Sequence, residues 1–363
     1  MMDLYVVGVA IYPARRRVTG ERLEEMVFSV TRAALDDAGV EREQIEQVTL
    51  AACDELDGRS ISSMLLAMPA GAYLRDEMKC TDSGLTGLCL GATRLRAGDH
   101  GLGLVVSWNK SSIAPFEDVM RMRAEPFFTR PIGLNAAVTD GLFAGAVSAA
   151  YGIAEEDASR AVLAWVARAA QNPRSAGLPL PSAASINASP YLATPLREGH
   201  CAPRTDGAAA MVLASGGWLA RHPGVEARAR LAGLGWSVDS YNLGGKRLAS
   251  LRSFRDSCTR AERMAGRSAR ELDVFELDCQ TGYHACAYAR ALDGHDPASL
   301  SPSGGAFAQN PYFCAGLVNA AEAVLQLSGD AGPVQRPRPR WAAAHQSHGY
   351  AQQGNVVAIF EGA

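Results

Sequence analysis

The sequence lacks the features of several large protein classes. None of its eight cysteines belongs to a CxxC pair, so neither a zinc finger nor a disulfide-dense scaffold is indicated. The net charge of −3 gives no electrostatic basis for binding nucleic acid or an anionic membrane. No stretch approaches the roughly 20 apolar residues of a membrane span. These absences favour a cytoplasmic protein with reduced thiols.

The first residues, MMDLYVVGVAIYP, contain a short apolar run with no basic leader and no cleavage-site pattern. We therefore expect residues 3–12 to form a strand rather than a signal peptide. The composition is 48% apolar and 20% charged, which is ordinary for a globular protein. A chain of 363 residues is long enough for two domains, each with its own core.

Strand-like and helix-like segments alternate along the chain. Within residues 20–39, Leu23, Met26, Val27 and Val30 recur at helical spacing. Further strands are expected at 48–55, 100–112, 205–215, in VEARARLAGLGWSV, DVFELDC and NVVAIF, and further helices at 80–98, 138–151, 155–170, 258–269, 281–292 and 313–328. This order predicts an α/β protein, with a sheet covered by helices on its faces.

The two halves of the chain share an order of elements: strand, helix, strand, small-residue helix, strand. Such an order indicates an internal duplication, although similar orders also arise by chance. The predicted halves are residues 1–220 and 221–363. Residues 115–200 contain two helical stretches and proline-rich loops, which favours a cap over a site rather than a linker.

Four segments carry motifs in a recognisable order: KCTDSGLTGLCLGATRLRAGDHGLGLVVSWNKSS (79–112), ATPLREGHCAPRTDGAAAMVLAS (193–215), SPSGGAFAQNPYFCAGLVNAAEAVLQLSG (301–329) and HQSHGYAQQGNVVAIFEG (345–362). Together they resemble the thiolase superfamily, nearest the sterol-carrier-protein-x type of thiolase. The resemblance implies a duplicated five-layer α/β/α/β/α fold that is usually a homodimer. It also implies Claisen-type carbon–carbon chemistry on acyl thioesters of CoA or a carrier protein, with no permanently bound cofactor.

Cys80 is the candidate nucleophile, because thiolases carry a cysteine at the start of a buried helix. There the helix dipole and free N–H groups favour the thiolate that acyl transfer requires. The register leaves an alternative, since Cys80-Thr81-Asp82-Ser83-Gly84 has one residue more than the family pattern and aligning Ser83 places Thr81 at the nucleophile position. Related acyltransferases with a cysteine-threonine-serine run favour Cys80, whereas the charge of Asp82 would oppose a thiolate. A merely packed cysteine is the other alternative.

The family's glycine-histidine-proline turn corresponds to Gln309-Asn310-Pro311-Tyr312. If the prolines are matched, Asn310 replaces the histidine, and an asparagine can donate to an oxyanion but cannot act as a base. If the count from Gly304 and Gly305 is kept, Pro311 holds that position. The superfamily also contains aldolases with tyrosines at the proton-handling positions, and Tyr312 and Tyr350 lie close to these two places. The alternative for each tyrosine is an aromatic side chain that fills a core with its hydroxyl satisfied.

The family's oxyanion loop corresponds to residues 277–280, in which Leu277 stands at the usual oxyanion position. His284 follows on the next helix and is a candidate to reach the pocket. His345 matches a family histidine, and His348 is the candidate substitute base; otherwise it is a loop histidine. Their HxxH spacing has no evident third ligand, so no metal is predicted.

Glycine-rich stretches match neither a P-loop nor a dinucleotide fingerprint, so no nucleotide cofactor is predicted. One of them, Gly244-Gly245-Lys246-Arg247, supplies Lys246 and Arg247 as candidates to bind a CoA phosphate.

Three functions remain open. The first is an acyltransferase or condensing enzyme with an acyl-Cys80 intermediate, assisted by His348. The second is a thiolase-fold aldolase that acts on a β-hydroxyacyl-CoA through Tyr312 and Tyr350. The third is a non-catalytic subunit that works with a thiolase-like paralogue or with a small OB-fold, zinc-ribbon accessory protein.

Overall fold

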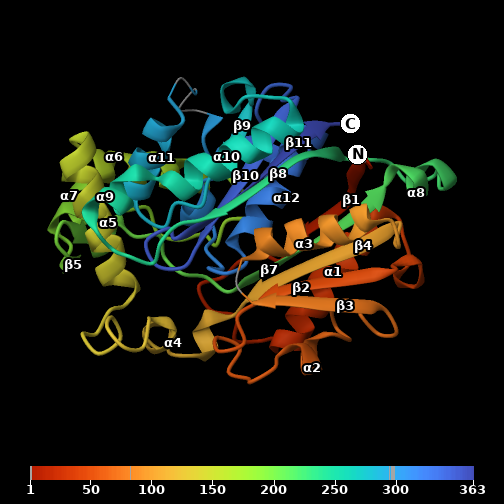
Figure 1. Ribbon diagram of the computed structural model, residues 1–363, viewed down its shortest axis with the longest axis horizontal. Coiled ribbons are helices and arrows are strands. Elements are labelled where there is room, and N and C mark those ends of the chain that lie inside the picture. The colour runs from red at the N-terminus through yellow and green to blue at the C-terminus, as the bar shows by residue number, and fades with distance from the viewer. Residues whose placement is uncertain (1, 82, 294, 296–298) are drawn as a thin grey trace.

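The computed structural model describes residues 2–81, 83–293, 295 and 299–363. Its centre is a nine-stranded mixed sheet of order β3-β2-β4-β7-β1-β8-β11-β10-β9 (Figure 1). The strands are β1 (Leu4–Ile11), β2 (Gln47–Ala52), β3 (Asp76–Thr81), β4 (Leu102–Asn109), β7 (Gly207–Ser215), β8 (Ala229–Val238), β9 (Val274–Glu276), β10 (Trp341–His348) and β11 (Gly354–Gly362). A separate hairpin pairs β5 (Tyr191–Ala193) with β6 (Leu196–Arg197).

The helices lie on both faces of this sheet and in the segment between β4 and β7. They are α1 (Leu23–Ala38), α2 (Ser63–Leu66), α3 (Gly84–Ala97), α4 (Phe116–Arg123), α5 (Ala136–Tyr151), α6 (Glu155–Ala169), α7 (Ala183–Ala188), α8 (Gly216–Arg221), α9 (Gly245–Ser250), α10 (Arg252–Ala265), α11 (Gly282–Ala291) and α12 (Ala315–Ser328). The expected segments 138–151 and 155–170 are confirmed as α5 and α6.

The sheet repeats one pairing order on the two sides of the junction between β1 and β8. On one side, β1 pairs with β7 and β7 with β4, both antiparallel, and β4 pairs with β2 in parallel. On the other side, β8 pairs with β11 and β11 with β10, both antiparallel, and β10 pairs with β9 in parallel. The boundary at residue 220 itself stays a prediction.

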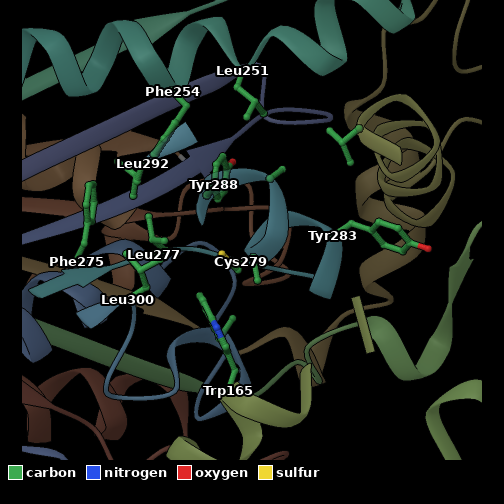
Figure 2. Close-up of a cluster of buried hydrophobic side chains, with 14 of the residues drawn as sticks. Trp165, Leu251, Phe254, Phe275, Leu277, Cys279, Tyr283, Tyr288, Leu292 and Leu300 are labelled. Carbon is green, nitrogen blue, oxygen red and sulfur yellow. The ribbon is translucent and has the colours of Figure 1, made fainter. Parts of the chain in front are cut away.

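The core consists of layers, and α3 and α12 form the central one. Leu88 of α3 and Leu317 of α12 share a buried cluster with strand residues from both halves of the sheet. Outside this layer, α1 packs against the first half and α10 against the second. Figure 2 shows the outer cluster around Phe254 of α10, whose ring lies 4.5 Å from that of Tyr288. The layering confirms the predicted α/β fold class.

Glycines allow the outer helices to lie directly on the strands. A Cβ atom on Gly235 of β8 would collide with the Ser257 carbonyl oxygen of α10. On the other half of the sheet, a Cβ atom on Gly8 of β1 would collide with the Ala34 carbonyl oxygen of α1. The same close approach of helix and strand therefore occurs in both halves.

The segment around Cys80 differs from the expectation of a helix over residues 80–98. β3 extends through Thr81, and α3 begins at Gly84 with Ser83 as its N-cap. The Ser83 side chain accepts a hydrogen bond from the Thr86 N–H at 3.1 Å, which fixes the helix start at this point. The prediction that Cys80 stands at a helix N-terminus is therefore wrong. Asp82, which was expected to oppose a thiolate, lies outside the described residues.

The cap segment, residues 115–200, packs against the second half of the chain. Phe143 of α5 and Val162 and Trp165 of α6 share a cluster with α11. In the part of the chain that the structure describes, no single helix has the length and apolar character to span a membrane. Helices α5 and α6 together have enough length and apolar character for a span, but the chain bends by 113° at the break between them.

Gly235→Ala is expected to lower the free energy of unfolding by about 1–3 kcal/mol, because the added methyl group must push α10 away from β8. Urea denaturation measures this change. Gly245→Ala is the matched control, since a Cβ atom at the first residue of α9 meets nothing within 4 Å. Equal stabilities of the two variants would contradict the close packing.

Candidate active site

A cavity of about 850 Å³ lies between the cap and the rest of the molecule. Its wall combines α4, α5 and the strip of residues 198–204 with Gln280 and Tyr312. Among the site residues predicted from the sequence, Tyr312 lines this cavity. The site is therefore built from segments that are far apart in the sequence.

Asp140 is the only charged residue of α5, and it lines the cavity. Its side chain is 23% exposed and lies 4.0 Å from Nε2 of His284. Within the described residues, no hydrogen bond reaches its carboxyl group. Desolvation, followed by the negative charges of Asp278 and Glu117, raises the pKa of Asp140 to about 7. A carboxyl group with such a pKa can accept a proton and return it near neutral pH.

In the cavity wall, Gln280 is hydrogen-bonded to Asp278 and Asn310. Its Nε2 donates to Oδ1 of Asp278 at 2.6 Å, and its Oε1 accepts from Nδ2 of Asn310 at 2.8 Å. Burial raises the pKa of Asp278 to about 6, although hydrogen bonds from Gln280 and Ser347 oppose the shift. Asn310 Nδ2 also donates to the Ala202 carbonyl at 3.4 Å. The Asn310 amide, expected to serve an oxyanion, therefore holds Gln280 in place.

Tyr312 presents its hydroxyl as a proton donor. Its ring packs edge-on against Phe116, with centroids 5.0 Å apart, and against Phe313 at 5.1 Å. Burial, followed by the charges of Asp140 and Asp278, raises the pKa of Tyr312, so the phenol stays protonated. Among the residues that the structure places, none hydrogen-bonds to this hydroxyl. It is thus available to a ligand in the cavity.

His345 and His284 are buried weak bases. Nδ1 of His345 accepts from the Asp278 N–H at 3.3 Å, and its Nε2 lies 2.7 Å from Oδ1 of Asn355. His284 stacks on Phe143 with ring centroids 4.4 Å apart, and its two ring nitrogens contact Thr281 and Gln352. Burial lowers the pKa of His345 to about 4 and that of His284 to about 3. These rings fix neighbouring groups rather than accept protons near neutral pH.

Four other predicted site residues do not line the cavity. His348 ends β10, where its ring covers Gly354. The Tyr350 hydroxyl donates to the carbonyl of Met120 in α4. Lys246 and Arg247 lie on α9, and Nη1 of Arg247 donates to a backbone carbonyl at 2.8 Å. Their assigned roles stay predictions.

The first N–H groups of α3 are hydrogen-bonded within the protein. The Gly84 N–H donates to the Phe313 carbonyl at 2.8 Å, and the Leu85 N–H donates to Oε1 of Gln346 at 3.1 Å. The Ser83 hydroxyl donates to the same Oε1 at 2.8 Å. The first N–H groups of a helix are the donors that a thiolate or an oxyanion would use. At α3 these donors are already bonded.

The Cys80 side chain packs against the side of α3 and does not lie at its N-terminus. It is half-buried on β3 opposite Ala51, and its Sγ would be 3.7 Å from a Cβ atom on Gly87 of α3. It is not among the residues that line the cavity. The nucleophilic role of Cys80 stays a prediction, without the helix N-terminus that motivated it.

The sequence motifs do not point to Asp140, Cys201 or Arg204, all of which line the cavity. A signal for Asp140 is present, because it interrupts the otherwise uncharged helix AAVTDGLFAGAVSAAY. Arg204 forms an ion pair with Glu117 at 3.0 Å on the cavity wall. Across the described ranges, no group of three or more His, Cys, Asp or Glu side chains could hold a metal ion.

Neither protein-family profiles nor curated protein sequences match this chain. Among solved structures, human mitochondrial 3-ketoacyl-CoA thiolase is similar, with a TM-score of 0.81 and 17% identity over 99% of this chain and 99% of that chain. The same human thiolase in complex with CoA gives a TM-score of 0.81 and 16% identity over 100% and 98% of the two chains. The chain has a thiolase-like fold. The sterol-carrier-protein-x subtype stays a prediction.

Asp140→Asn is expected to change how stability depends on pH. Because the folded-state pKa of Asp140 is raised, its stabilising contribution is complete below its unfolded pKa and is lost as the pH rises through about 7. Relative to the variant, the wild type should lose about 2 kcal/mol of unfolding free energy between about pH 5 and pH 8. Urea denaturation at both pH values measures this difference.

Asp118→Asn serves as the control, because the Asp118 side chain on α4 is 62% exposed. It should leave the pH dependence as in the wild type. If Asp140→Asn also leaves the pH dependence of the unfolding free energy unchanged, the pKa of Asp140 is not raised by burial.

Proposed function

We propose that this protein is an acyl-thioester enzyme of the aldolase type. It would break or make a bond between the α carbon of a thioester and a carbonyl carbon by acid–base catalysis. The observation that carries the proposal is the carboxyl group of Asp140, with a pKa of about 7, in the wall of the same cavity as Tyr312. The thiolase-like fold supports the thioester as the substrate class, since the similar human thiolase is known in complex with CoA.

In the cleavage direction, Asp140 takes the proton of the β-hydroxyl group. The bond between the α and β carbons then breaks, its electron pair passes into the enolate, and the β carbon leaves as an aldehyde or ketone. Tyr312 donates a hydrogen bond to the enolate oxygen, where negative charge develops. Asp140 then returns the proton to the α carbon. One β-hydroxyacyl thioester gives one acyl thioester and one carbonyl compound, with no oxidant or reductant consumed.

The surrounding residues suit this assignment. The charge of Asp278 contributes to the raised pKa of Asp140, and Gln280 and Ser347 hold Asp278 by hydrogen bonds. Gln280 is held in turn by Asn310. Asp278, Gln280 and Asn310 are therefore positioning residues in this proposal.

Two cations on the cavity wall, Arg16 and Arg204, suit the phosphate groups of a CoA thioester. Lys246 and Arg247 do not line the cavity, so they are placed less well for this contact. The acyl-Cys80 hypothesis has less support, because the N–H groups at the start of α3 are bonded to Gln346 and Phe313.

Asp140→Asn is expected to lower kcat for a β-hydroxyacyl-CoA by about 100-fold or more, because the variant cannot accept the hydroxyl proton. Tyr312→Phe should lower kcat by roughly 10- to 100-fold through loss of the enolate hydrogen bond. Cys80→Ala should keep the wild-type rate. The released aldehyde or ketone is trapped as a hydrazone and quantified.

Two results would replace this proposal. If Cys80→Ala abolishes turnover and intact-protein mass spectrometry finds an acyl group on the wild type, the acyl-cysteine mechanism holds. If the wild type turns over no β-hydroxyacyl-CoA, and does so only after addition of a paralogue or accessory protein, the chain is a subunit of a complex.

A further inference from the structure

A second, smaller pocket lies beside the cavity, with a volume of about 280 Å³. We call it the side pocket. Its apolar lining comes from Val162, Val166 and Ala169 of α6, from Phe307, and from the loop 178–181. This loop is the proline-rich stretch of the cap, so the cap supplies one wall.

Two polar side chains of the side pocket, Asn172 and Ser175, have protein partners, whereas the exposed Glu198 lies where the side pocket meets the cavity. Nδ2 of Asn172 donates to the Ser303 carbonyl and to Oε1 of Glu322, both at 3.0 Å. The Ser175 hydroxyl donates to the Ala308 carbonyl at 3.2 Å. Away from Glu198, the pocket therefore presents apolar surface to a ligand, and recognition there would depend on burial of hydrocarbon.

The side pocket and the cavity share the wall residues Glu198, Cys201 and Pro203. This strip is fixed to the cavity wall, because the Ala202 N–H donates to the Gln280 carbonyl at 2.8 Å. Burial raises the pKa of the Cys201 thiol to about 12, so at neutral pH it is an uncharged, weakly polar contact. A ligand that extends from Gln280 over Cys201 thus passes from polar into apolar surroundings.

We infer that the side pocket holds the hydrocarbon group attached to the reacting carbons of the thioester and sets its size, an inference that rests on the proposed function. An apolar cavity of about 150 Å³ accommodates one benzene ring. A volume of 280 Å³ therefore fits a group about twice as large, such as two fused rings or a medium-length chain. Val166 and Leu180 are the residues proposed to determine specificity.

The test compares the binding of octanoyl-CoA and acetyl-CoA by isothermal titration calorimetry, without turnover. The wild type should bind octanoyl-CoA about tenfold or more tightly, since burial of its additional methylene groups is favourable. Val166→Phe fills the pocket and should remove most of this preference. Ala164→Phe is the matched control, because Ala164 lies on the exposed face of the same helix, and it should keep the preference.

If the Val166→Phe variant does not fold, Leu180→Asp gives the same test at the rim, where Leu180 is 64% exposed. It should weaken binding of octanoyl-CoA and leave acetyl-CoA binding unchanged. Equal affinity of the wild type for both thioesters, no binding of octanoyl-CoA, or an unchanged preference in the folded pocket variants would overturn the inference. If the protein prefers octanoyl-CoA but never releases an aldehyde or ketone, the role of the side pocket stands and the proposed aldolase activity is wrong.

Discussion

The side-chain amide of Gln346 joins three segments of the chain at the start of α3. Its Oε1 accepts from the Ser83 hydroxyl and the Leu85 N–H, and its Nε2 donates to the carbonyls of Tyr312 and Phe313 at 3.2 and 3.1 Å. Gln346 is buried on β10, so these bonds connect the second half of the sheet to the central helix. The same amide closes the helix N-terminus and anchors the turn that carries Tyr312 into the cavity.

Because the N-terminus of α3 is closed, its N–H groups are not available for the acyl-cysteine chemistry that the resemblance to thiolases implies. The fold resembles that of a thiolase over 99% of the chain, but fold alone does not fix the reaction. With the α3 donors satisfied, we propose Asp140, which lines the cavity, as the group that transfers the proton. Its raised pKa depends on the cap, because α5 places the carboxyl group where burial, followed by the charges of Asp278 and Glu117, disfavours its ionisation.

Much of the fold follows from the sequence, and the exceptions have physical causes. Apolar periodicity locates α5 and α6 to within a few residues, because their buried faces repeat at helical spacing. β3 is missed since its residues DEMKCT lie at the sheet edge with no buried side chain, so no apolar pattern marks it. Motif comparison finds Tyr312. It does not find the raised pKa of Asp140, which comes from burial and from the charges of Asp278 and Glu117 on other segments of the chain.

The exchange of α protons tests whether Asp140 is the base. In deuterated water, a base that returns a proton to the α carbon must also exchange the α protons of a product thioester such as octanoyl-CoA, and proton NMR follows the loss of their signal. We expect exchange by the wild type and by Cys80→Ala, and none above background by Asp140→Asn. Exchange at the wild-type rate by Asp140→Asn, or its loss in Cys80→Ala, would contradict the assignment of Asp140 as the base.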